Sequence, residues 1–398
     1  MNAMKLGWID YSSEHKNKVM AVLDLLSDKG AIDELGIGLI RDGFADVLFP
    51  GTSTLQTRAK YFFIIPYLMM DLEKERHSSP GEFLEKLGSM EVDVIETLLR
   101  KDAEGVIGAR AGKKLKRKPS SVYWSGLKTF EIFKHDLTLN NYAKAVFRMQ
   151  RNKESLRSLG NEESDDLTIA GSEYTSTYWQ CLIPESNWKE NLSMDLTFNE
   201  AGFLKDRMIK SRKSKDSLLA FLLQQNPSEL EKIDDFDAIG EVFSLPDGLS
   251  DDYAIAKNFS MFIAGANIRY NVILSNHENK EAIQEWKEWK ESSFIKNEFP
   301  YFRYQDVLYR LKINNPLLKR FLSEWQKTAL SNDETMIDEL LIKREIELKS
   351  KERAKLYNTK FYAYEEGKWL GSKKLQYRFR NSKDLMVDIL SGLEGGHA

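Results

Sequence analysis

A run of cations followed by hydroxyl groups and aromatic rings is the strongest chemical feature of the sequence. Five cations fill six positions: Lys113, Lys114, Lys116, Arg117 and Lys118. Hydroxyl and ring side chains and a further lysine follow, namely Ser120, Ser121, Tyr123, Trp124 and Lys128. Loop cations can neutralise phosphates and release their counterions. A helix that begins at a serine cap presents N–H groups to an anion, and exposed rings can stack on bases. These residues therefore predict a nucleic-acid contact.

Ordinary core packing is the alternative for the same rings. The helical face on which they lie has apolar spacing and comprises Tyr123, Trp124, Leu127, Phe130 and Phe133. In that case the helix belongs to the core, and the lysines ahead of it form a solvated loop. The two interpretations are compatible, because loop cations can meet a polyanion while the rings behind them are buried.

A second basic stretch lies between residues 205 and 215, with Lys210, Arg212 and Lys213 at its centre. These three extend the same polyanion surface or form a solvated helix face. Charge is unevenly distributed along the chain. Residues 100–157 contain fifteen Lys or Arg against five Asp or Glu, whereas residues 229–252 contain nine acids against one lysine. In a chain of net charge −3, this asymmetry favours one surface for a polyanion and another for a different partner.

Catalytic and cofactor signatures are weak. The glycines and lysines of residues 108–114 lack the spacing and the hydroxyl residue of a phosphate-binding loop. Glu345, Glu347 and Lys349 have the E-x-K spacing of a metal-dependent nuclease, but on the helix expected there, positions two apart point away from each other. We predict no cofactor and no metal site and favour a protein that is not an enzyme. An atypical metal-dependent nuclease is one alternative.

A protein-interaction scaffold is the other alternative. The region 286–325 is strongly aromatic and contains Trp286, Trp289, Phe294, Phe299, Tyr301, Phe302, Tyr304 and Trp325. Core packing is the default interpretation of these rings, and a partner-binding groove is the sharper one. The acidic stretch 229–252 is a second candidate docking surface.

Helical spacing of apolar residues, together with only 9 prolines and 23 glycines, predicts a mainly α protein with minor β structure. We expect helices over residues 39–49, 54–72, 92–101, 121–133, 254–274 and 334–358. Ser53 or Thr54 would cap the second of these, and Ser120 or Ser121 the fourth. Helices 92–101 and 121–133 are typical of a helix-turn-helix or winged-helix unit near residues 90–135.

The 398 residues exceed what one hydrophobic core usually holds, so a multi-lobed protein is expected. We predict an N-terminal helical domain over 1–155, a central one over 172–285 and a C-terminal one over 286–398. The polar residues 152–171 are the best linker candidate.

The cellular compartment is inferred from features that the sequence lacks. Cys181 is the only cysteine, which favours a reducing environment. The longest apolar run, over residues 61–70, is half of the roughly 20 residues that a membrane span needs. The first sixteen residues lack the order of a signal peptide. We therefore expect a cytoplasmic protein without a membrane partner.

Several stretches together resemble a bacterial family that is known only as a domain of unknown function. They are DELGIGLIRDGFADVLFPGTSTLQTRAKYFFIIPYL, KRKPSSVYWSGL, DLTFNEAGFLKDRM, SMFIAGANIRYN and KSKERAKLYN. Members of that family tend to lie among anti-phage or mobile-element genes, near helicases and phospholipase-D-like nucleases. The basic residues and this setting together favour an accessory or recognition subunit of an anti-phage defence system that binds DNA or RNA beside a helicase or nuclease. The resemblance itself implies the setting and not a chemistry. It implies no catalytic residue.

Overall fold

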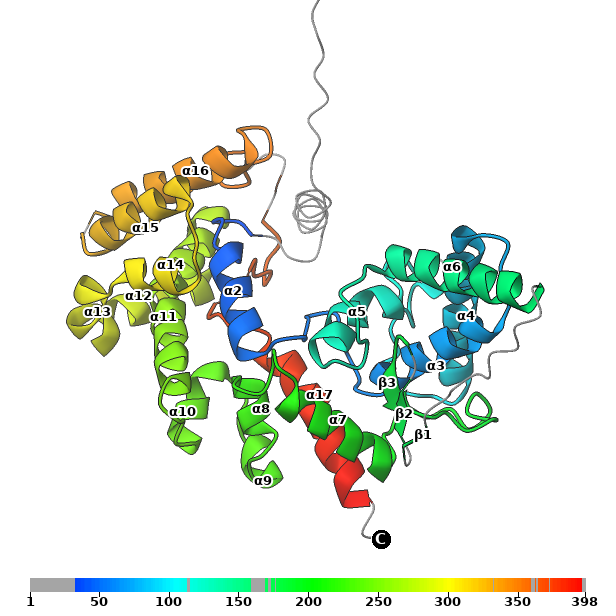
Figure 1. Cartoon of the computed structure of the whole chain (residues 1–398). Helices are drawn as coiled ribbons and strands as arrows, with labels where there is room; N and C mark the ends of the chain where they lie inside the picture. Colours follow the sequence, from blue (N-terminus) through cyan, green and yellow to red (C-terminus); the bar gives the residue numbers. More distant parts are fainter. Residues whose placement is uncertain are drawn as a thin grey trace, which may run out of the picture. The chain divides into compact units, whose positions relative to one another are not determined.

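A computed structural model of the chain describes residues 33–112, 115–158, 169–170, 173–175, 177–331, 333–358, 362, 364–371 and 373–395. Across these residues the protein is mainly α, as predicted, with one small sheet (Figure 1). The chain forms two compact units. Unit 1 is Met1–Ile40 with Phe259–Lys374, and unit 2 is Arg41–Asn258 with Leu375–Ala398. The division into three domains and the helix-turn-helix unit stay predictions.

Unit 2 holds most of the helices that precede residue 259 and the last helix of the chain. They are α3 (Tyr61–Lys74), α4 (Pro80–Arg100), α5 (Pro119–Thr129), α6 (Leu139–Ser158), α7 (Phe198–Lys210), α8 (Leu218–Leu222), α9 (Pro227–Leu230), η2 (Phe236–Ala238), α10 (Ile239–Val242) and α17 (Phe379–Glu394). Two further helices, α2 (Gly38–Leu48) and α11 (Leu249–Leu274), begin in one unit and end in the other.

Helix α3 is the centre of the unit 2 core. It is buried nearly all round, with eleven of its 14 residues inaccessible, including Pro66. A helix that is apolar on every side must be covered on every side, and both α4 and α5 pack against it. In the same unit, α17 packs along α7, and Phe203 of α7 contacts Phe63 of α3.

The sheet is antiparallel, in the order β1 (Ile169–Ala170), β2 (Glu173–Thr175) and β3 (Gln180–Leu182). Tyr174 lies opposite Cys181 in its register. An isolated bridge between Phe133 and Trp179 connects the segment after α5 to the start of β3.

Unit 1 has an aromatic core. Its helices after α11 are α12 (Lys280–Glu291), α13 (Ser293–Asn297), η3 (Phe299–Tyr301), α14 (Tyr304–Arg310), α15 (Pro316–Ala329) and α16 (Glu334–Lys349). Trp286, Trp289 and Trp325 are buried and stack in sequence, with ring centroids 5.2 and 5.7 Å apart. The ring of Trp289 lies so close to Gly265 of α11 that a Cβ would overlap it. Core packing of these tryptophans is therefore confirmed.

The helix predicted over 54–72 begins later, because tertiary contacts take its first residues. Ser53 and Gln56 form a turn in which Gln56 Oε1 accepts the Ser53 N–H at 3.1 Å, and α3 starts only at Tyr61. The Ala59 N–H donates to the carboxylate of Asp388 at 2.7 Å. Capping by Ser53 or Thr54 is therefore wrong, because backbone donors ahead of α3 have partners elsewhere in the fold.

Two other helix predictions have different outcomes. Helix α11 contains the whole of the expected 254–274 helix. The helix expected over 334–358 ends at Lys349, where Ser350 adopts a left-handed conformation with φ of 71°. Within the part of the chain described, no helix combines the length and apolar character that crossing a lipid bilayer requires.

Candidate nucleic-acid interface

The start of α5 differs from the predicted serine cap. Lys118 occupies the N-cap position without a side-chain cap, and Pro119 is the first helical residue. Proline suits that position, because its fixed φ is helical and the donor it lacks would be unpaired. The Ser120 N–H instead donates to Glu91 Oε1 of α4 at 2.6 Å. A cap by Ser120 or Ser121 is therefore wrong, since a carboxylate from another helix does that task.

Glu91 is an unusual partner because its side chain is only 2% exposed. Burial raises the pKa of Glu91 to about 7, although the hydrogen bonds from Ser120 and the charge of Lys118 act against that rise. The Lys118 ammonium lies over Gly88 and leaves no room there for a Cβ. An internal carboxylate therefore occupies the helix start that was expected to attract a phosphate.

The two aromatic residues of the predicted interface lie in the core. Tyr123 is fully buried, and its hydroxyl accepts the N–H groups of Thr57 and Arg58 at 3.0 and 3.1 Å and donates to the Arg58 carbonyl at 2.8 Å. Trp124 is 8% exposed and donates its ring N–H to the Leu137 carbonyl at 2.9 Å. Both rings hold α5 in place, and their faces pack against other aromatic rings.

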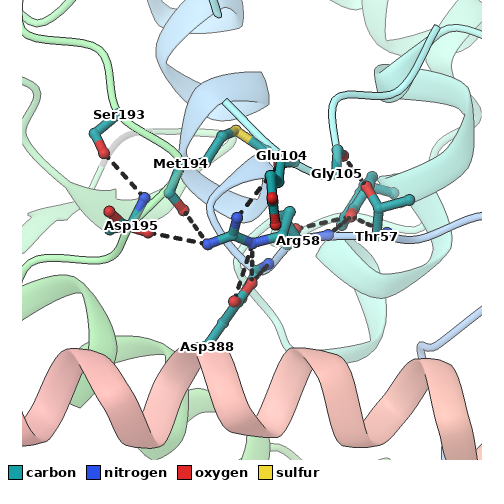
Figure 2. A network of polar contacts seen from close by, with 10 residues as sticks. Thr57, Arg58, Glu104, Gly105, Ser193, Met194, Asp195 and Asp388 are labelled. Carbon is teal, nitrogen blue, oxygen red and sulfur yellow. Dashed lines mark hydrogen bonds and ion pairs between the residues drawn. The ribbon is translucent and has the colours of Figure 1, made fainter. Parts of the chain in front are cut away.

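Arg58, which Tyr123 holds by its backbone, joins four parts of unit 2. Figure 2 shows its guanidinium between Asp388 of α17 and Asp195, which precedes α7. Both ion pairs are 3.0 Å long. The same group donates to the carbonyls of Glu104 and Met194. Burial raises the pKa of Asp388, and the Ala59 N–H and Arg58 partly offset this. These hydrogen bonds and ion pairs hold the segment before α3, the segments at Glu104 and Met194, and α17 together.

The exposed side of α5 is a narrow row of polar residues. Ser121, Ser125 and Lys128 are the positions of this helix that reach solvent, at a spacing of four and three residues. Such a spacing places them on one face. Lys116 is exposed just ahead of the helix, whereas Arg117 and Lys118 are half-buried. Ser125 was missed by sequence reasoning, although its helical spacing from Ser121 would have found it.

The second basic stretch lies at the other end of α5. Arg207 of α7 donates to the Phe130 carbonyl at 2.9 Å, and the Arg212 N–H reaches Glu131 at 3.4 Å. Lys128 forms a 2.8 Å ion pair with Asp136. The pKa of Asp136 is lowered first by Lys128, and Lys213 contributes to the same direction. The C-terminal end of α5 therefore gathers Lys128, Arg212 and Lys213.

Together these side chains form what we call the α5 strip, defined as Lys116, Ser121, Ser125, Lys128, Arg212 and Lys213, of which Lys128 is half-buried and the others are exposed. Helix α5 has 11 residues and is about 16 Å long at 1.5 Å per residue. Of the other predicted residues, Lys210 is exposed and pairs with Asp206 of its own helix. Lys113 and Lys114 lie outside the described residues.

In unit 1, helix α16 separates Glu347 from Glu345 and Lys349. Glu345 is buried and accepts the Tyr270 hydroxyl at 2.8 Å and the Lys349 ammonium at 2.9 Å. Glu347 is on another side of α16, where it pairs with Arg320 at 2.8 Å. Among the described residues, no group of three or more His, Cys, Asp or Glu side chains is placed to hold a metal ion.

This geometry defines a class of protein: mainly helical, with a strip of hydroxyl and cationic side chains along one short helix. The chain belongs to the family of unknown function DUF6361, whose model matches residues 3–285. Comparisons with curated proteins and with solved structures find no match.

Proposed function

We propose that this protein binds nucleic acid through the α5 strip, as an accessory or recognition subunit. One observation carries the proposal. Cations from two parts of the sequence lie at opposite ends of one helix, and the exposed face between them bears only the hydroxyl groups of Ser121 and Ser125. Lysine, arginine and serine are among the side chains that contact phosphates.

The geometry favours contact with the backbone of the nucleic acid over contact with its bases. Tyr123 and Trp124 are buried, so stacking on the α5 strip has no exposed ring. The roughly 16 Å of α5 correspond to about five steps of a strand at 3.4 Å each. The ion pair between Lys128 and Asp136 is exposed on the aspartate side, and such pairs are weak enough for a phosphate to replace them.

The setting that we propose is a bacterial anti-phage defence system in the cytoplasm, beside a helicase or a nuclease. It is supported by the family resemblance and is independent of the geometry of α5.

Charge reversal tests the proposal. We expect Lys116→Glu, Arg212→Glu and Lys213→Glu together to weaken binding to a labelled DNA or RNA by at least about tenfold at low salt. The logarithmic salt dependence of duplex binding should fall by about 2.7, because each lost phosphate contact removes about 0.9. Fluorescence anisotropy titrations at several salt concentrations measure both quantities.

A matched control separates this strip from net charge alone. Lys232→Glu, Lys287→Glu and Lys343→Glu change the same charge at exposed positions elsewhere and should leave affinity nearly unchanged. Equal losses in the two triple variants would overturn the assignment to α5. Absence of a complex with single-stranded or duplex DNA or RNA at low ionic strength would overturn nucleic-acid binding itself and favour the scaffold.

A further inference from the structure

A groove lies between α14 and α15 of unit 1. Figure 1 draws these two helices in yellow to orange. Its volume is about 630 Å³, and its lining includes Leu308, Tyr309, Lys312, Ile313, Pro316 and Lys319. That volume lies within the range of natural ligand sites. The groove falls within the aromatic region 286–325, where a binding groove was an alternative to core packing.

Among the residues that line the groove, Tyr309 has an exposure that packing does not explain. Its side chain is 87% exposed, whereas the tryptophans of the same region are buried. Exposing an aromatic ring leaves a large apolar surface in water. A flat ligand that covers the ring would remove this unfavourable contact between apolar surface and water.

The lining of the groove is basic. Two lysines and no acidic residue line it. Residues 303–320 contain five Lys or Arg and a single acid, Asp306, which pairs with Arg303 at 3.2 Å. The start of α15 is already capped, because Asn315 Oδ1 accepts the N–H groups of Leu317 and Leu318 at 3.1 Å. An anion in the groove would therefore meet the lysine side chains.

We propose that this groove binds single-stranded nucleic acid, with an unpaired base stacked on Tyr309 and phosphates held by Lys312 and Lys319. Stacking rings beside cations are the common means by which proteins hold single strands without sequence preference. An acidic peptide would also neutralise the lysines, but its carboxylates would gain no stacking contact with the face of the tyrosine ring. A duplex keeps its bases stacked on each other, so it gains nothing from that ring.

The proposal goes beyond the proposed function, because it concerns a different unit and a different part of the nucleic acid. The α5 strip contacts phosphates of any strand, whereas the groove selects unpaired bases. Residues 305–319 also lie beyond the part of the chain that the family model matches.

Substitution of Tyr309 in the full chain tests the groove. The probe is a labelled fifteen-nucleotide oligothymidine, and the background is the triple charge-reversal variant of the α5 strip, which leaves the groove intact. We expect Tyr309→Ala to weaken binding about five- to hundredfold, which corresponds to one stacked base. Tyr309→Phe and Tyr309→Trp should retain binding, because they keep the stacking surface.

Tyr301→Ala is the matched control, since Tyr301 is 81% exposed in the same region but is not among the residues that line the groove. It should bind like its parent. Lys312→Gln with Lys319→Gln should lower the logarithmic salt dependence by about 1.4, at about 0.7 for each phosphate of a single strand. Lys287→Gln with Lys343→Gln, at exposed positions on the same unit, should not change it.

Each outcome decides between the two proposals. Binding of oligothymidine that Tyr309→Ala leaves unchanged, or loss of all oligothymidine binding in the triple variant, overturns the groove and leaves the α5 strip standing. Unchanged duplex binding in the triple variant, with loss of single-strand binding in Tyr309→Ala, overturns the α5 strip alone. Displacement of the oligonucleotide by poly-L-glutamate at equal charge concentration overturns the base-stacking proposal in favour of an acidic peptide.

Discussion

Glu91 shows how a single buried residue can govern a surface feature. Its carboxylate accepts the N–H at the first turn of α5 and lies near the half-buried Lys118. It therefore holds the end of the loop that leads into the α5 strip. Because burial disfavours the charged form, the pKa of Glu91 is raised to about 7, and protonation near neutral pH changes the charge beneath that loop.

This shift has a consequence for stability. A carboxyl group whose pKa is higher in the folded than in the unfolded state binds more protons when folded. Its contribution is fully present below the unfolded pKa of about 4.5 and is lost as pH rises through about 7. The loss is on the order of 3 kcal/mol. We expect Glu91→Gln, which cannot ionise, to gain stability relative to the wild type as pH rises from 5 to 8.

Thermal melts at several pH values measure this difference. Glu82→Gln is the control, because Glu82 lies in the same helix and hydrogen bonds from Ser78 lower its pKa to about 2. It stays ionised from pH 5 to 8, so its difference from the wild type should be constant. A constant difference for Glu91→Gln as well would contradict a raised pKa.

At the level of elements, α7 packs against α17 and also contacts the C-terminal end of α5. Helix α7 begins with a capping box in which Thr197 and Glu200 satisfy each other's backbone N–H groups. Glu200 also forms a buried 2.6 Å ion pair with Lys60, the N-cap residue of α3. The C-terminal part of α7 carries Arg207, which donates to the end of α5. The position of the second basic stretch therefore depends on how α7 packs against α3 and α17.

Alanine substitutions at two glycines of the α7–α17 contact are expected to change the free energy of unfolding in opposite directions. A Cβ on Gly392 of α17 would lie 2.9 Å from the Cβ of Ala201 and 3.0 Å from that of Leu196. Overpacking of this kind typically costs about 1–3 kcal/mol, against a gain of about 1 kcal/mol in helix propensity. At Gly202 of α7 the nearest atom would be 3.9 Å away, which leaves only the gain.

We therefore expect Gly202→Ala to raise the free energy of unfolding by about 0.5–1 kcal/mol and Gly392→Ala to lower it. Chemical denaturation of both variants gives the comparison. A Gly392→Ala protein as stable as Gly202→Ala would show that the two helices separate without cost.

On the scale of the whole molecule, the chain divides its charged surfaces between two compact units. The α5 strip and the acidic residues 229–252 belong to unit 2, and the Tyr309 groove belongs to unit 1. The acidic stretch forms the short helices and turns around α9, η2 and α10. Helix α11 is continuous across residues 258 and 259, where one unit ends and the other begins.

A shared helix should couple the stability of the two units. A proline in the interior of a helix removes a hydrogen bond and clashes with the preceding turn, at a cost of about 3 kcal/mol or more. We expect Asn258→Pro to accelerate amide hydrogen exchange in peptides from both units. Mass spectrometry resolves the exchange peptide by peptide.

Lys287→Pro provides the comparison, because α12 belongs to unit 1 alone. Its effect should remain within unit 1. Exchange that rises in only one unit after Asn258→Pro would contradict coupling through α11.

Properties that depend on local pattern could be predicted from the sequence alone. Apolar spacing identified the α11 helix and the mainly α class, because helix formation and amphipathic burial are encoded over neighbouring residues. The helical context of Glu345, Glu347 and Lys349 was also predictable, and the structure places Glu345 and Glu347 with different partners. The run of cations before α5 was visible from composition alone, and among those that the structure describes Lys116 is exposed whereas Arg117 and Lys118 are half-buried.

Only the tertiary structure decided which groups face solvent and which partner each of them has. The rings of Tyr123 and Trp124 are core, the start of α5 is held by Glu91, and Tyr309 is exposed beside two lysines. Glu91 lies 29 residues before Ser120, and Arg58 lies 65 residues before Tyr123, and no local pattern encodes contacts at that range. Burial and charge neutralisation depend on the packing of distant segments, so only the folded chain shows which of these side chains reach solvent.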